Sequence, residues 1–146
     1  MPTRSLLLLT LTLLMTACGS LPPTTNSALT TFTLDNESNP EALQAAEGGD
    51  IGRPTIVFFH ARWCQLCQKV RPEVEALADK YEDDVTFIRM DINAADARPS
   101  VNRYQVHSTP TFVLLAADGN VLASIPGWPG EEMMELTIQE LLNPEQ

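Results

Sequence analysis

FFHARWCQLCQKVRP, residues 58–72, places two of the chain's three cysteines, Cys64 and Cys67, only two residues apart. The residues around its first part, 53–61, are β-branched, aromatic and nearly all apolar, which predicts a buried central strand. A helical pattern begins at Cys64, so the pair lies where a strand passes into a helix. Such a pair can bind a metal, close a structural disulfide or exchange electrons, and the spacing alone does not decide among these uses.

The helix is predicted from Cys64 to Tyr81, because apolar residues recur there at spacings of three and four. Pro72 lies inside this helix and should kink it. The predicted apolar positions are Leu66, Val70, Val74, Leu77, Ala78 and Tyr81.

The rest of the chain alternates between helical and strand patterns. A short helix is expected after Ser38 or Asn39, a helical stretch interrupted by Pro99 at residues 93–104, and a terminal helix at 130–142. The terminal helix should pack on the sheet through Met133, Met134, Leu136, Ile138, Leu141 and Leu142, with at least one methionine facing the sheet. Strands are expected at 84–92, 110–116 and 121–125, the last two joined by a turn at 117–120. This order predicts an α/β domain, with a central mixed sheet and helices on both faces.

Size and charge narrow the class of protein. The chain has 146 residues, which suggests one domain, and its formal net charge is −10. This charge argues against nucleic acid as a partner, because little here would neutralise phosphates. Three cysteines are too few for a disulfide-rich scaffold.

The N-terminal segment predicts export and a lipid anchor. Residues 1–17 have a basic start and a short apolar core, which is typical of a signal peptide, and LMTACGS at 14–20 resembles the lipobox of bacterial lipoproteins. Cys18 would then carry lipid. Residues 18–37 would form a flexible tether, in which Phe32 and Leu34 could form a short edge strand, and residues 38–146 would form the domain. The alternative is an ordinary signal peptide with an incidental cysteine. The anchor predicts a location in the cell envelope, on the outer face of the cytoplasmic membrane or on the outer membrane.

The chain resembles the thioredoxin family over roughly residues 39–142. Three features carry the resemblance: the order of elements, WCQLC at residues 63–67 and STPTFVLL at residues 108–115. The resemblance implies a thioredoxin-like fold and a redox-active Cys64–Cys67 pair. It also matches Trp63 to the tryptophan before the first cysteine and Pro72 to the helix proline. Tyr104 matches an aromatic six residues before Pro110, and Pro110 matches a cis-proline that faces the disulfide.

Two positions depart from the pattern of cytoplasmic thioredoxins. Phe58 stands where those proteins have a buried aspartate, and Arg89 corresponds to its partner lysine. Gln65 and Leu66 stand between the cysteines in place of Gly-Pro. These features are more similar to membrane-tethered thioredoxin-like proteins of the bacterial envelope and thylakoid lumen.

The expected chemistry uses both cysteines. Cys64, at the positive end of the helix and next to Arg62, would be the exposed nucleophile, and Cys67 the buried resolving thiol. Trp63, Thr109 and Pro110 would contact the substrate chain. A passive disulfide would stabilise little, because its loop is very small.

Two histidines could take part in other ways. Zinc would need four ligands, and with Cys18 lipidated only His60 and His107 remain as partners, so neither metal nor cofactor is expected. His60 is either a packed residue of the strand or a proton carrier in place of the missing carboxylate.

The sequence thus predicts an extracytoplasmic thiol–disulfide oxidoreductase that reduces protein disulfides. A membrane thiol donor would supply electrons, and the targets would be apocytochrome c or other envelope proteins, serving cytochrome c maturation or thiol homeostasis. The alternatives are an envelope oxidase or isomerase, and a non-enzymatic lipoprotein that uses the fold for binding.

Overall fold

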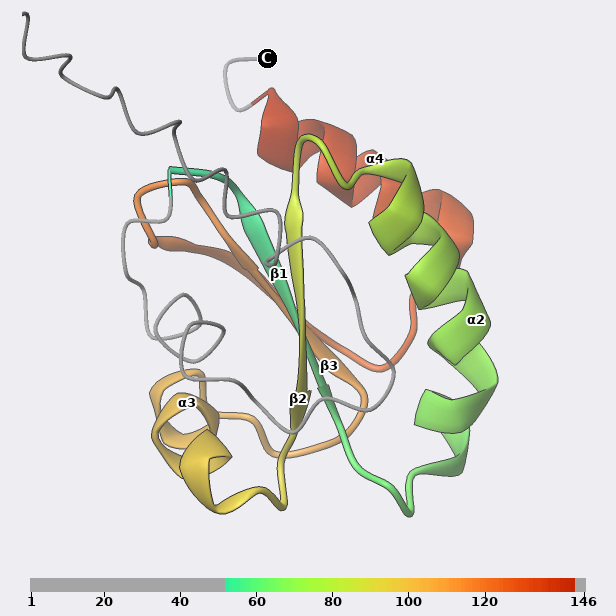
Figure 1. Ribbon diagram of the computed structural model, residues 1–146, viewed down its shortest axis with the longest axis vertical. Helices are drawn as coiled ribbons and strands as arrows, with labels where there is room; N and C mark the ends of the chain where they lie inside the picture. Colours follow the sequence, from blue (N-terminus) through green and yellow to red (C-terminus); the bar gives the residue numbers. More distant parts are fainter. Residues whose placement is uncertain (1–51, 144–146) are drawn as a thin grey trace, which may run out of the picture.

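The computed structural model describes residues 52–143, and Figure 1 shows its arrangement. The predicted signal peptide, the tether with Cys18, and the elements expected before residue 52 lie outside the described residues. None of the described helices is both long and apolar enough to span a membrane.

Four strands form one mixed sheet in the order β2-β1-β3-β4. The strands are β1 (Thr55–His60), β2 (Thr86–Asp91), β3 (Thr111–Leu115) and β4 (Val121–Pro126). β1 pairs in parallel with β2 and antiparallel with β3, and β3 and β4 form an antiparallel hairpin. This confirms the predicted mixed sheet and its hairpin.

Helices cover both faces of the sheet. The helices are α2 (Gln65–Lys80), α3 (Arg98–Arg103), preceded by a 3₁₀ turn at Ala95–Ala97, and α4 (Glu131–Leu142). In Figure 1, α2 and α4 lie side by side along one face, and α3 lies at the other.

Alternate residues of β1 enter two separate cores. Ile56 and Phe58 pack in the cluster that includes the buried residues of α2 and α4. Val57 and Phe59 pack in the second cluster, with Ala97 and Tyr104 from the α3 side. All six residues of β1 are buried, as expected for a central strand with both faces covered.

Some apolar residues of the helices are exposed, contrary to the prediction. Leu66 on α2 is exposed, as are Met133 and Leu136 on α4. The buried side of α4 is formed by Met134, Ile138 and Leu141, at spacings of four and three. Leu136 lies two residues from Met134, on the opposite side of a helix with 3.6 residues per turn. Met134 alone of the two methionines is buried, which confirms that at least one faces the sheet.

Pro99 does not interrupt a helix, as the sequence had suggested, but begins one. It occupies the first turn of α3. A proline is compatible with that position, because the N–H it lacks would have no partner within the helix. In α2 the helix continues through Pro72.

Candidate redox site

The structure joins Cys64 and Cys67 in a disulfide, with an S–S distance of 2.07 Å and Cα atoms 5.2 Å apart. Cys64 is the N-cap residue of α2, and the backbone N–H of Cys67 donates to Cys64 Sγ over 3.1 Å. The first turn of α2 contains no acidic residue. A sulfur held at this end of a helix is therefore placed where a thiolate is stabilised once the disulfide is reduced.

Both sulfurs are shielded in the disulfide form. Cys64 is 5% exposed and Cys67 3% exposed, so the expectation of an exposed Cys64 is wrong for this form. The reason is that both half-cystines pack into the core cluster of α2 and α4. The exposed groups are their neighbours: Trp63 is 68% exposed and Leu66 is 43% exposed, which leaves an apolar surface beside the disulfide.

The cis-proline loop lies at the same end of the sheet. The Thr109–Pro110 peptide bond is cis, as the resemblance implied. Thr111, the first residue of β3, pairs with Phe59 near the end of β1, and β1 leads directly to the cysteines. Strand pairing thus brings the ends that carry Pro110 and Cys64 together.

His60 is the last residue of β1 and is only 5% exposed. Burial, and next the positive charge of Arg89, lower the pKa of His60 to about 4, although Asp91 opposes this. Its Nε2 is buried and has no hydrogen-bond partner within residues 52–143. The imidazole is therefore neutral near pH 7 and is a weak base; its role in proton transfer stays a prediction.

Phe58 fills its position with apolar packing. It is 1% exposed and its ring stacks on that of Phe112, with centroids 4.9 Å apart. In the register of the two parallel strands it is paired with Arg89, the residue matched above to the family's lysine. Phe58 and Arg89 therefore lie side by side at the predicted place.

A carboxylate that the sequence analysis did not single out lies on α2. Burial raises the pKa of Glu75, while Arg71 and Arg89 act in the opposite direction. Glu75 Oε1 is buried without a hydrogen-bond partner among the described residues. Cys67, Arg71 and Glu75 follow each other at intervals of four, which puts them along one side of the helix, and that spacing was the available signal.

Trp128 is a second residue that sequence reasoning missed. Its Nε1–H donates to Glu73 Oε2 over 2.8 Å, and its ring centroid lies 5.4 Å from that of Phe112. The preceding residue, Gly127, donates its N–H to the carbonyl oxygen of Pro110 over 2.8 Å. Trp128 therefore links the cis-proline loop to α2. Its partner Glu73 is 55 positions away in the sequence, so no local sequence pattern could predict this contact.

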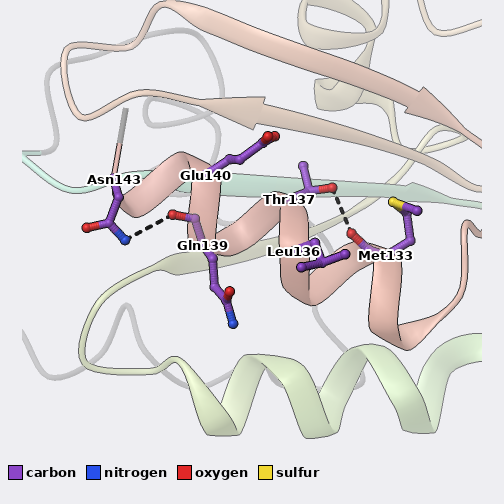
Figure 2. A pocket seen from close by; sticks show the side chains of 6 residues that line it. All are labelled: Met133, Leu136, Thr137, Gln139, Glu140 and Asn143. Carbon is purple, nitrogen blue, oxygen red and sulfur yellow. Dashed lines mark hydrogen bonds between the residues drawn. The ribbon is translucent and has the colours of Figure 1, made fainter. Parts of the chain in front are cut away.

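A separate hollow runs along α4, lined by Met133, Leu136, Thr137, Gln139, Glu140 and Asn143. Figure 2 shows these side chains with two hydrogen bonds that stay within the helix, from Thr137 to the Met133 carbonyl and from Asn143 to the Gln139 carbonyl. Its lining contains no cysteine or histidine. Within residues 52–143, no three His, Cys, Asp or Glu side chains are grouped so that they could hold a metal ion.

Comparison with known proteins agrees with this geometry. The model of the thioredoxin family matches residues 33–140. The chain is 34% identical over 101 residues to a thiol:disulfide interchange protein TxlA homolog from Synechocystis sp., covering 69% of this chain and 56% of that protein. It is 29% identical over 86 residues to the chloroplastic thioredoxin-like protein HCF164 of Arabidopsis thaliana, covering 59% of this chain and 33% of that protein. The chain thus spans about half or less of the length of these two relatives.

Among solved structures, the crystal structure of oxidised thioredoxin O2 from Arabidopsis thaliana is similar, with a TM-score of 0.58 and 25% sequence identity. The similarity covers 70% of this chain and 85% of that chain.

Proposed function

Because the chain belongs to the thioredoxin family and holds its Cys64–Cys67 pair as a disulfide, we propose that this thiol–disulfide oxidoreductase is an extracytoplasmic protein-disulfide reductase. It would be held at a membrane through lipid on Cys18. A membrane thiol donor would reduce it, and its targets would be envelope proteins such as apocytochrome c.

The observation that carries the redox function is the position of the disulfide. Cys64 caps α2 and receives a hydrogen bond from the Cys67 N–H. After reduction, the same N–H and the positive end of the helix favour the Cys64 thiolate over the thiol. A disulfide with only a stabilising role would need neither feature, and its loop is too short to restrict the unfolded chain by much.

The reaction consumes one dithiol and one disulfide. The Cys64 thiolate attacks a sulfur of the partner disulfide, forms a mixed disulfide and releases the first partner thiolate, which takes up a proton. Cys67 then loses its proton and attacks Cys64 Sγ, which closes the Cys64–Cys67 disulfide and releases the second partner thiol. Two electrons pass from the protein to the partner, and the membrane donor must return two electrons to restart the cycle.

Envelope placement is supported by residues 14–20, LMTACGS, after a short apolar run. A relative named as a thiol:disulfide interchange protein supports exchange with protein partners. His60 would serve as a proton carrier for Cys67 only if partner binding raised its low pKa.

Trapping is the experiment that tests the reductase role. In Cys67→Ser the second attack cannot occur, so partners should remain bound to Cys64, and mass spectrometry should identify envelope proteins with cysteines. Cys64→Ser is the matched control and should trap none. Recovery of equal partner sets with both variants, or of no envelope thiol protein, would refute the proposal.

The runner-up is an oxidase or isomerase that uses the same pair. Equilibration with glutathione separates these roles, because the reduction potential of a reductase should be about −270 mV, that of an isomerase about −180 mV and that of an oxidase about −120 mV. A non-enzymatic binding role would leave insulin unreduced.

A further inference from the structure

The segment that holds the disulfide carries only positive charges, although the chain has a net charge of −10. Between His60 and Pro72 there is no Asp or Glu, whereas Arg62, Lys69 and Arg71 lie in that stretch. The side chain of Arg62 is 80% exposed, and Lys69 is exposed as well. The segment that carries the two cysteines is thus cationic.

The two exposed cations lie beside the exposed apolar residues. Arg62 directly precedes Trp63, and Lys69 follows Leu66 by three residues on the exposed side of α2. Residues three apart on a helix are neighbours on its surface. A chain segment that contacts Trp63 and Leu66 therefore meets positive charge on both sides.

The positive charge of Arg62 is partly neutralised by a largely covered carboxylate. Arg62 Nε lies 3.5 Å from Asp91 Oδ2, but the side chain of Asp91 is only 13% exposed. The carboxylate is largely covered while the guanidinium faces solvent. An approaching partner therefore meets the cation before the anion.

The acidic loop that follows α2 lies away from this end. It contains Glu82, Asp83 and Asp84, all exposed. On α2 itself the first acid is Glu73, four residues after Lys69, and its carboxylate accepts the hydrogen bond from Trp128. Figure 1 shows that α2 begins at one end of the sheet and that this loop lies at the opposite end. A helix of 16 residues is about 24 Å long, and charges in physiological salt are screened beyond about 8 Å. Local cations, rather than the distant acids of that loop, therefore set the potential at the disulfide.

We infer that the redox face selects extended protein segments whose reacting cysteine is flanked by acidic residues. Such a segment places its cysteine at Cys64 and its carboxylates near Arg62 and Lys69, while apolar side chains contact Trp63 and Leu66. Attraction between unlike charges raises the rate of encounter and orients the partner. This preference rests on the proposed function, because it names the class of segment that the same dithiol reduces.

The test uses three peptides that differ only in the residues beside a single cysteine, which are Glu, Gln or Lys. Each is supplied as its symmetric disulfide and mixed with the reduced full-length protein, and oxidation of Cys64–Cys67 is followed by acid quenching and mass measurement. Reduction of each peptide by dithiothreitol, which is uncharged, gives the intrinsic reactivity by which each rate is divided. The normalised rate should be about fivefold or more higher for the Glu peptide than for the Lys peptide at physiological salt, ~0.15 M, where the distant acids are screened. The ratio should fall below about twofold at ~1 M salt, where charges are screened beyond about 3 Å.

Neutral variants locate the effect. Arg62→Gln and Lys69→Gln should each lower the Glu-to-Lys ratio, and the double variant should bring it close to one. Lys80→Gln removes the same charge from the far end of α2, where Lys80 pairs with Glu135, and should leave the ratio unchanged. Equal normalised rates for all peptides, or a ratio that both cationic-site variants retain, would overturn the charge preference while leaving the reductase function standing. If no peptide is reduced, the proposed function fails first.

Discussion

At the scale of single residues, Phe58 makes the surroundings of the second cysteine less able to accept a proton. Its ring is buried and stacked on Phe112, and Phe58 and Cys67 belong to the same core cluster. An apolar environment raises the free-energy cost of forming the Cys67 thiolate. The slow step should therefore be release of the mixed disulfide, with turnover that rises steeply with pH.

Phe58→Asp should speed that step. A carboxylate in place of the ring can accept the Cys67 proton, and proton transfer of this kind typically contributes ~10²–10⁴-fold in rate. Losing the ring should lower the free energy of unfolding by about 3–5 kcal/mol, to which burial of a polar group adds. Insulin turnover from pH 6 to 9 measures the effect. Phe58→Asn is the matched control, since it has similar size but no base. Equal turnover in the two variants would show that the missing carboxylate does not limit the protein.

His60 should make the oxidised protein lose stability in acid. The pKa of His60 is about 4 in the folded protein, against the ordinary value of 6.5 in the unfolded chain, so the unfolded state binds more protons between these values. The free energy of unfolding is therefore independent of this group above pH ~6.5 and falls as pH decreases toward 4, by about 2 kcal/mol at pH 5. Urea unfolding between pH 4 and 8 should show a shallower acid slope in His60→Gln than in the wild type. Parallel slopes would mean that the buried imidazole does not titrate as described.

At the scale of elements, α2 has two roles: its first turn positions the disulfide, and its later turns pack in the core through their apolar side. The repeated spacing of apolar residues predicted the helix from the sequence, because burial of one side imposes that period. It did not predict that Leu66 faces solvent, since a residue at the edge of the apolar stripe is buried only if another element covers it. Trp128 was missed for a related reason: its partner Glu73 lies on another element, and only the fold brings the two together.

The first turn of α2 should make the two thiols unequal after reduction. The helix end should lower the Cys64 pKa from ~8.5 toward the ~3.5–7.5 range of activated thiols, while the apolar core keeps Cys67 protonated. Iodoacetamide at pH 6 should therefore label Cys64 well before Cys67, as followed by peptide mass mapping. Cys67→Ser should keep the fast labelling of its remaining cysteine, and Cys64→Ser should label slowly. Similar, slow labelling of both thiols would contradict the role of the helix end.

At the scale of the whole molecule, the order of strands and helices along the chain was predictable. Apolar residues recur with different spacings in helices and strands, and turns between them are marked by characteristic residues. Residues 53–61 were apolar on both sides of the predicted strand, and β1 is indeed covered on both faces. The strand order could not be derived from periodicity, since pairing depends on contacts between distant segments. The thioredoxin resemblance, carried by WCQLC and STPTFVLL, implied the fold, and the strand order β2-β1-β3-β4 came from the structure.

The lipid anchor would determine where in the cell envelope the thioredoxin-like domain acts. If Cys18 is acylated, the mature protein should begin at that residue, carry the mass of its acyl chains and partition into the detergent phase. Each buried CH₂ contributes ~0.8 kcal/mol to membrane binding, and two or more chains are needed for stable attachment. Cys18→Ala should therefore release the protein or stall its processing, whereas Cys64→Ser, which changes only the redox pair, should stay membrane-bound. Wild-type protein that is soluble, cleaved elsewhere and without acyl mass would rule out the anchor, and the domain would then have to meet its electron donor by diffusion.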